Sequence, residues 1–256
     1  MGVQNKIAVL MTCHNRRDAT LRCLTSLTEA LAVSGGTTVK VFLVDDGSTD
    51  GTAEAVARIF TSVEILRGDG DLYWAKGMRK AWEAAVAESD DWDGFLWLND
   101  DTELDADAFG KMLEAGDDER IVVGDLANSR GEIVYGLREA GLFTGNCVLV
   151  PHKVYEQLGM ICGGYSHAWA DSDYSMMAKR SGITVVSAGI VGKAEWHPNR
   201  PRLNGLSLKE RLGMLRNPKG WNLHDLWLYR KRNWGVFAAI ASCAHLLVHV
   251  IVGESD

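Results

Sequence analysis

The chain has 256 residues, enough for one large α/β domain or two modest ones, and its composition, 46% hydrophobic and 24% charged, is that of an ordinary globular protein. Its five cysteines show no Cys-x-x-Cys spacing, which argues against a disulfide framework or a zinc site and fits a reducing cytoplasm. The first apolar run, residues 7–11, is far too short for a secretory signal peptide.

Charge is unevenly distributed along the chain. Residues 1–199 carry 18 Lys and Arg against 30 Asp and Glu, whereas residues 200–232 carry nine basic residues against two acidic ones. An acidic body followed by a basic segment predicts a negatively charged surface as the partner of that segment. We expect no nucleic acid among the partners.

The first hundred residues alternate strand and helix patterns. Apolar and β-branched runs predict four buried strands, at residues 6–12, 38–44, 62–66 and 94–98. Helical spacing predicts three helices between them, at residues 18–31, 53–60 and 72–88. This alternation indicates βαβ units and a mainly parallel sheet, whose ligands bind beyond the carboxyl ends of the strands. Polar clusters at residues 12–16, 45–49 and 99–102 follow three of the strands, so we expect them to line one cleft.

After residue 120 the pattern is less regular. Short strands are predicted at residues 121–123, 133–135, 147–150 and 183–188, and a short helix at residues 171–180. They indicate a mixed extension of the sheet. From residue 201 the sequence becomes basic and rich in Leu and Trp. We therefore expect an α/β domain over residues 1–200 and a helical C-terminal region over residues 201–256.

The strongest local motif is Val-Asp-Asp-Gly-Ser-Thr-Asp-Gly-Thr at residues 44–52. A strand, a tight turn and a capped helix would explain its second half. They do not explain Asp45 and Asp46, two adjacent carboxylates that repel each other at a strand end. A carboxylate at this position can accept the imide N–H of a uracil or thymine ring, so the motif predicts a pyrimidine nucleotide.

A second motif, Asn99-Asp100-Asp101-Thr102, ends the very apolar strand at residues 94–98. It can serve as the N-terminal cap of a helix predicted at residues 105–113. Hard oxygen ligands of this kind also hold Mg²⁺ or Mn²⁺, which would neutralise the charge of a departing diphosphate.

These two motifs, preceded by Thr12-Cys13-His14-Asn15-Arg16, resemble family 2 glycosyltransferases of GT-A fold in order and spacing across roughly residues 5–200. The resemblance implies a GT-A-like sheet flanked by helices and transfer of a sugar, with inversion, from a UDP- or dTDP-sugar to an acceptor hydroxyl. It places Thr12 and His14 beside the nucleotide ring and Asp45 at the base. Arg16 is expected among the same nucleotide- and sugar-binding residues.

The resemblance also implies a metal site for Mn²⁺ or Mg²⁺. The family motif is usually Asp-x-Asp, and here Asn99 stands in the first position. Asp101 is then the direct ligand, and Asn99 or Asp100 contacts the sugar, the phosphate or a metal-bound water. His197, in Glu-Trp-His-Pro, is the implied further ligand, with an exposed loop histidine as the alternative.

The family's general base lies in a Glu-Asp pair that opens a helix. Here residues 169–174 read Trp-Ala-Asp-Ser-Asp-Tyr, so Ala170 replaces the Glu and the base falls on Asp171. Asp173 would point about 160° away on a helix and could serve only if the helix starts later. Helix capping is the alternative for both. The departures at Ala170 and Asn99 leave open a second function, that of a catalytically inactive nucleotide-sugar-binding module.

The segment Gly-Asp-Gly-Asp-Leu-Tyr-Trp-Ala-Lys-Gly at residues 68–77 opens the third predicted helix, whose N-terminus is suited to anions. Asp71 favours sugar or ribose hydroxyls, and Lys76 could reach a phosphate. Trp74 either stacks on a ring or belongs to the core. The segment resembles family members that build bacterial surface polysaccharides, some of them rhamnosyltransferases. This implies a saccharide or lipid-linked acceptor.

The C-terminal region combines basic and apolar residues. Leu208, Leu212 and Leu215 lie among basic residues at helical spacing, and residues 234–253 carry no formal charge. Three uses stay open: attachment to a membrane surface, packing or homodimerisation, and a bilayer span. We expect a cytoplasmic protein that is peripheral on the inner face of the cell membrane.

Overall fold

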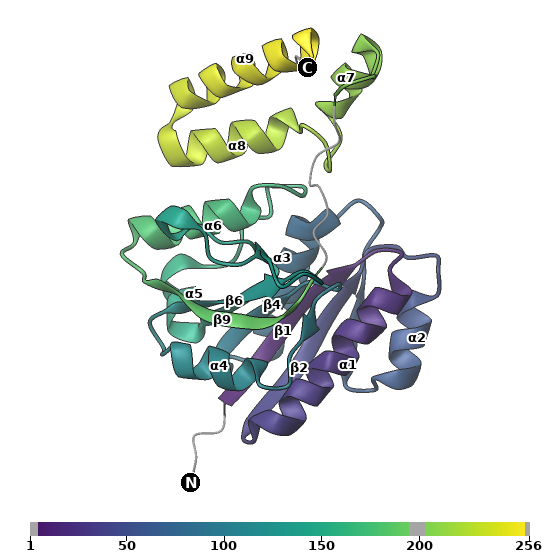
Figure 1. Cartoon of the computed structure of the whole chain (residues 1–256), viewed down its shortest axis with the longest axis vertical. Coiled ribbons are helices and arrows are strands. Elements are labelled where there is room, and N and C mark those ends of the chain that lie inside the picture. The colour runs from purple at the N-terminus through teal and green to yellow at the C-terminus, as the bar shows by residue number, and fades with distance from the viewer. Residues whose placement is uncertain (1–4, 195–202, 254–256) are drawn as a thin grey trace.

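A computed structural model describes residues 5–194 and 203–253 (Figure 1). The strands are β1 (Asn5–Cys13), β2 (Thr37–Asp45), β3 (Val63–Arg67), β4 (Gly94–Leu98), β5 (Glu103–Leu104), β6 (Ile121–Ala127), β7 (Ile133–Tyr135), β8 (Cys147–Pro151) and β9 (Val185–Lys193). The helices are α1 (Arg17–Ser34), α2 (Thr52–Ile59), α3 (Tyr73–Glu88), α4 (Ala108–Ala115), α5 (His152–Leu158), α6 (Ala170–Arg180), α7 (Leu208–Met214), α8 (Leu223–Trp234) and α9 (Val236–Val252), with a 3-10 turn at Glu139–Gly141.

One mixed sheet organises residues 5–194. Its order is β3-β2-β1-β4-β8-β6-β9-β5, and β7 pairs with β6. Strands β1 to β4 are parallel, β8 runs antiparallel to both β4 and β6, and β9 is parallel to β6. The predicted parallel half with a mixed extension is confirmed.

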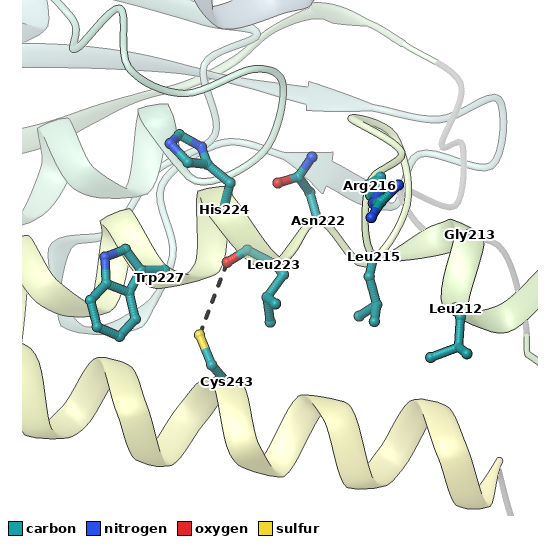
Figure 2. A pocket seen from close by; sticks show the side chains of 9 residues that line it. All are labelled: Leu212, Gly213, Leu215, Arg216, Asn222, Leu223, His224, Trp227 and Cys243. Carbon is teal, nitrogen blue, oxygen red and sulfur yellow. Dashed lines mark hydrogen bonds between the residues drawn. The ribbon is translucent and has the colours of Figure 1, made fainter.

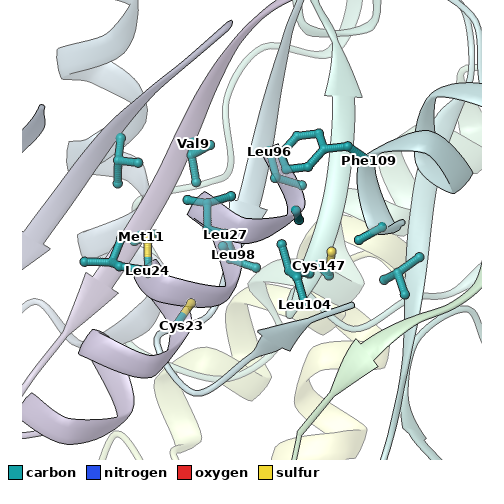
Figure 3. Close-up of a cluster of buried hydrophobic side chains, with 14 of the residues drawn as sticks. Val9, Met11, Cys23, Leu24, Leu27, Leu96, Leu98, Leu104, Phe109 and Cys147 are labelled. Carbon is teal, nitrogen blue, oxygen red and sulfur yellow. The ribbon is translucent and has the colours of Figure 1, made fainter. Parts of the chain in front are cut away.

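Alternating side chains of the central strands build a core on each face of the sheet. On one face, apolar residues of β1 and β4 meet α1 and α4, as Figure 3 shows for Met11, Leu24, Leu98 and Phe109. The other face is rich in aromatic rings from β4, α3 and α6; its fully buried members include Trp82, Phe95, Trp97 and Tyr174. Both faces of β1 and β4 are covered, which explains why these strands are continuous apolar runs.

The predicted elements of the first hundred residues are present with ends shifted by a few residues. The helix predicted from residue 105 begins at Ala108, because the Asp105 amide donates to the Val191 carbonyl and ties that residue to β9. Two elements were missed: β5, which has two residues, and α5, which follows β8 without a connecting loop. Both are too short for a periodic pattern.

The uncharged stretch over residues 234–253, for which a bilayer span was one of three open uses, is divided. Trp234 ends α8, Gly235 has a φ of 88°, and α9 begins at Val236. Within the described ranges, no helix is both long enough and apolar enough to cross a bilayer. Helix α8 lies between α9 and α6, so α9 is the outermost layer of the molecule (Figure 1).

Two buried carboxylates join the C-terminal helices to the sheet domain. Asp173 of α6 accepts hydrogen bonds from Arg232 (2.9 Å) and Asn233 (2.8 Å). Asp225 of α8 is fully buried and accepts from the Ser166 and His167 amides at 3.1 and 3.2 Å. Charge-assisted hydrogen bonds of this kind are short and directional, so they fix α8 against the loop that precedes α6.

Candidate functional site

The ends of β1, β2 and β4 lie side by side, as predicted. In the parallel register Cys13 pairs with Asp45, and β4 lies on the other side of β1. Strand β1 begins at the end of the sheet domain far from α9 and runs towards the C-terminal helices, so the carboxyl ends of these parallel strands point that way (Figure 1). All three polar clusters therefore occupy one edge of the sheet.

Asp45 is completely buried at the end of β2. One carboxylate oxygen accepts from the Ser48 amide at 3.0 Å, and the other accepts from the Arg67 guanidinium at 3.0 Å. Arg67 ends β3 and its side chain is 62% exposed, so it can move at little cost. A nucleotide base that donates to Asp45 would share or replace this contact.

Asp46 has a structural role. Its carboxylate accepts from the amides of Gly70, Leu72 and Tyr73 at 2.9 to 3.1 Å, and so ties the glycine-rich segment to the end of β2. A side chain at Gly68 would collide with it, since a Cβ there would lie 2.4 Å from Asp46 Oδ1. The two adjacent carboxylates therefore have separate partners, which explains how they coexist.

His14 and Thr12 lie close to the same segment. His14 Nδ1 donates to the Asp46 carbonyl at 2.6 Å, which leaves the exposed ring held in one orientation. Thr12 lies under the first turns of α3, where a Cβ at Gly77 would be 2.4 Å from its hydroxyl. Both residues lie at the end of β1, beside the end of β2 that carries Asp45. The sequence predicts the nucleotide among these three residues.

Arg16 bridges the two carboxylates after β4. Its guanidinium donates to Asp100 at 2.9 Å and to Asp101 at 2.8 Å. Burial raises the pKa of Asp100 to about 7; the neighbouring Asp101 adds to the shift, and Arg16 opposes it. This pair is thus a compact, partly neutralised anionic site.

The same pair has the donor chemistry of a divalent-metal site. Asp100 Oδ2 and Asp101 Oδ1 are buried and have no hydrogen-bond partner among the described residues. Two unpartnered carboxylate oxygens are suitable ligands for Mg²⁺ or Mn²⁺. The described ranges contain no group of three or more His, Cys, Asp or Glu side chains placed to hold a metal ion together. His197, the further ligand predicted from the sequence, lies outside them.

Trp74 and Asn99 form a second part of the site. The Trp74 indole donates to Asn99 Oδ1 at 2.7 Å, so the amide that replaces the usual Asp holds an aromatic ring. Gly145 lies against this ring, since a Cβ there would be 2.5 Å from it. The Gly145 amide in turn donates to Asp171 at 3.2 Å. A chain of contacts therefore connects α3, the end of β4 and the first turn of α6.

Asp171 and Asp173 differ in their surroundings. Helix α6 begins at Ala170, so Asp171 lies in its first turn, half-buried beside Gly145. Burial raises the pKa of Asp171, and the Ser172 and Gly145 amides and the charge of Arg138 oppose the shift. Asp173 is 1% exposed and turned to Arg232. Of the two alternatives, only Asp171 has a carboxylate free of ion pairs in the described structure.

Asp71 and Lys76 are exposed at the start of α3, where the structure gives their side chains no specific role. A cavity of about 370 Å³ lies next to Arg16 and is lined by residues 15–19 and Asp50. A larger cavity of about 970 Å³ opens elsewhere, between α7, α8 and α9, lined largely by apolar side chains such as Leu223 and Trp227 (Figure 2). It is remote from the carboxylates in sequence and does not include any residue predicted for the site.

Three contributors were missed from the sequence: Arg67, Asp46 as a structural residue, and Gly145. Alternation along a strand implies that Asp45 and Asp46 point to opposite sides, which was a usable signal. Arg67 follows the third predicted strand and lies beside Asp45 in the parallel register, which was another. Gly145 had no signal of its own, because its role depends on long-range contacts with Trp74 and Asp171.

Comparison with known proteins agrees with this geometry. The model of the family "Glycosyl transferase family 2" matches residues 8–173. The chain belongs to this family. Its members are defined by sugar transfer, and the matched residues include every described motif from β1 to the first turn of α6. None of the curated protein sequences compared with the chain matches it.

Solved structures of glycosyltransferases share the fold. The mannosyltransferase PcManGT from Pyrobaculum calidifontis, in complex with GDP-Man and Mn²⁺, is 15% identical; the match covers 100% of this chain and 77% of that one, with a TM-score of 0.59. S. aureus TarS 1-349 is 14% identical over 96% of this chain and 90% of that one, with a TM-score of 0.58. The complex of TarS 1-349 with UDP-GlcNAc is 14% identical over 94% of this chain and 71% of that one, with a TM-score of 0.59. At this identity the likeness confirms the GT-A-like fold.

Proposed function

We propose that the protein is an inverting glycosyltransferase that moves a sugar from a UDP- or dTDP-sugar to an acceptor hydroxyl. The observation that carries this proposal is the contact chain from Trp74 and Asn99 through Gly145 to Asp171. It puts a carboxylate with a raised pKa beside the strand ends that would hold the donor. A carboxylate at this position can accept the proton of an acceptor hydroxyl.

In this reaction Asp171 takes the proton of the acceptor hydroxyl. The acceptor oxygen forms its bond to the anomeric carbon while the bond to the diphosphate breaks on the opposite side, so the configuration inverts. A single displacement needs no covalent bond between sugar and protein. Residues 1–200 would supply the transferase domain, and residues 201–256 an attached helical region.

The nucleotide would bind between Thr12, His14 and Asp45. Buried Asp45 supports recognition of a base N–H. Its Oδ2 atom accepts from Arg67, whose exposed side chain can move away and leave this oxygen to the base. The test is calorimetry with UDP, dTDP and GDP. We expect a pyrimidine nucleotide to bind best, and Asp45→Asn to weaken it by roughly 1–3 kcal/mol. Preference for GDP, the nucleotide in the PcManGT complex, would contradict the base assignment.

Asp101 and Asp100 would hold Mn²⁺ or Mg²⁺, with His197 as the further ligand. When bound, the cation supplies positive charge that stabilises the departing diphosphate. We expect Asp101→Ala to abolish turnover and excess chelator to do the same, with activity restored by added Mn²⁺. Full turnover in chelator would remove the metal from the proposal. The control is Asp105→Ala, an acidic residue four positions later.

The acceptor would be a saccharide or a lipid-linked saccharide of a bacterial cell surface, and the transfer would resemble that of a rhamnosyltransferase. The protein would work on the inner face of the cell membrane. The C-terminal helices would attach it there or pair two copies. Release of nucleoside diphosphate with Mn²⁺ and candidate acceptors tests the activity. Donor binding without any release would instead identify an inactive binding module, the function that Asn99 and Ala170 leave as the second candidate.

A further inference from the structure

Exposed apolar side chains are concentrated in the C-terminal helices. Thirteen large hydrophobic residues are exposed among the described residues, and nine of them lie within residues 203–253, a small part of the described chain. They are Leu208, Leu212, Trp234, Val236, Phe237, Ile240, Val248, Ile251 and Val252. Scattered exposed apolar residues are normal on a protein surface, but a concentration like this marks a binding surface.

On α9 these residues form one stripe. At about 100° per residue, Phe237, Ile240, Val248 and Ile251 fall within an arc of roughly 80°. Phe237 is 83% exposed. The residues on the opposite side, Ala239, Leu246 and Val250, are buried. Since α9 is the outermost layer, its apolar stripe faces away from the sheet (Figure 1).

Basic residues stand at both ends of this stripe. Arg230 lies over the Trp234 ring, 5.0 Å from its centre, just before α9 begins. Arg211 lies at the other end, because a Cβ at Gly253 would be 2.6 Å from its guanidinium. Neither arginine, nor the exposed Lys231, forms an ion pair within the described ranges, whereas Arg232 is paired with Asp173. Helix α9 itself contains no acidic residue.

We propose that the outer face of α9 docks on an anionic lipid bilayer, with the apolar stripe at the headgroup boundary and the basic residues at lipid phosphates. Apolar burial and attraction to anionic lipid act together on such a helix. A second copy of the chain fits less well. The stripe is about 26 Å long and 10 Å wide, or about 260 Å², well below the roughly 800 Å² that each partner buries in a stable dimer. Pairing two stripes would also bring the basic residues of the two copies together.

This docking would place the candidate base near the membrane. Helix α8 separates α9 from α6, which carries Asp171. Packed helices are about 8–10 Å apart, so Asp171 would lie roughly 20 Å from the docking face. A lipid-linked acceptor could present its hydroxyl at that height. The acidic residues 1–199 would be repelled by the same lipids, which favours one orientation. The docking itself does not depend on the sugar-transfer chemistry.

Vesicle flotation of the full chain tests the proposal. We expect flotation with vesicles of phosphatidylglycerol and phosphatidylcholine, little with phosphatidylcholine alone, and a decrease at high salt. Phe237→Glu and Val248→Glu should each lower the bound fraction by about tenfold or more. The matched controls are Val33→Glu and Ile133→Glu, at sites 64% and 58% exposed on the sheet domain, which should float like the parent.

The outcomes separate the alternatives. Equal flotation of the α9 variants and the controls, or no flotation of the parent chain, would overturn the proposal. A dimer in light scattering that Phe237→Glu dissociates, without vesicle binding, would assign the stripe to a second copy. Release of nucleoside diphosphate from the donor is measured for the parent chain and for every variant. If the parent chain shows no release, the proposed transferase activity is rejected, and the docking result is unaffected.

Discussion

The sheet domain and the C-terminal helices bury their apolar residues in different ways. The sheet domain, residues 5–194, has a continuous core on each face, and only four of its large hydrophobic residues are exposed. Residues 203–253 have a small core of Leu203, Leu246 and Val250, and nine of their large hydrophobic residues are exposed. The first region is stabilised by its own burial. The second leaves much of its apolar surface uncovered.

The same contrast holds for buried carboxylates. In the sheet domain Asp45 and Asp100 follow strand ends and Asp171 lies in the first turn of α6, and their amide or guanidinium partners come from the same domain. At the junction, Asp173 and Asp225 have partners from the other region. Burial alone therefore does not distinguish a carboxylate proposed for the site from one that joins the two regions.

The largest expected effect is a difference in turnover between variants of Asp171 and Asp173, two carboxylates on the same helix. Asp171→Asn should lower turnover by about 10²–10⁴ with donor affinity nearly unchanged, because it removes the general base. Asp173→Asn, the matched control, should keep turnover within a few-fold and lower thermal stability, because Arg232 loses its buried partner. Steady-state kinetics and calorimetry measure both. The reverse pattern would assign the base to Asp173.

A smaller effect is expected at the junction. Asp225→Asn should destabilise the docking of α8 by about 2–4 kcal/mol, since the Ser166 and His167 amides lose a charged acceptor in a dry site. Limited proteolysis should then cleave the C-terminal region faster and leave the sheet domain intact. The control is Lys231→Gln, at an exposed position of the same helix. Unchanged proteolysis of Asp225→Asn would mean that the two regions are held together by apolar contacts alone.

The smallest effect concerns pH. Burial lowers the pKa of His167 to about 4, with the charge of Lys219 adding to the shift. The unfolded chain therefore binds the proton more readily between pH 6.5 and 4, so stability falls as pH decreases through this window. Between pH 7 and pH 5 the loss from His167 is about 2 kcal/mol. His167→Phe should remove that part of the pH dependence in thermal melts; an unchanged slope would contradict it.

Local patterns were sufficient to predict the parallel half of the sheet, because β1, β2 and β4 are apolar runs bounded by polar motifs. They also placed Asp45, Asp101 and Asp171 at element ends, where the structure has them. The contacts of Arg16 with Asp100 and of Trp74 with Asn99 join residues 84 and 25 positions apart. Such pairs depend on strand order, which periodicity does not specify.

The C-terminal region was harder to predict for a related reason. Residues 234–253 have the composition of one apolar helix, but Gly235 divides them, since its positive φ ends α8. The exposed stripe of α9 was visible only once Ala239, Leu246 and Val250 were found buried on the other side. Which face of an apolar helix is covered depends on its neighbours.

The Arg16 bridge has a consequence for the order in which ligands assemble. A cation bound to the unpartnered oxygens of Asp100 and Asp101 would lie close to a guanidinium that already binds the other oxygen of each carboxylate, and the two positive charges would repel. A nucleoside diphosphate that arrived with the cation would supply negative charge to both. The two ligands should therefore bind cooperatively, each raising the affinity of the other by the same factor, as thermodynamic reciprocity requires.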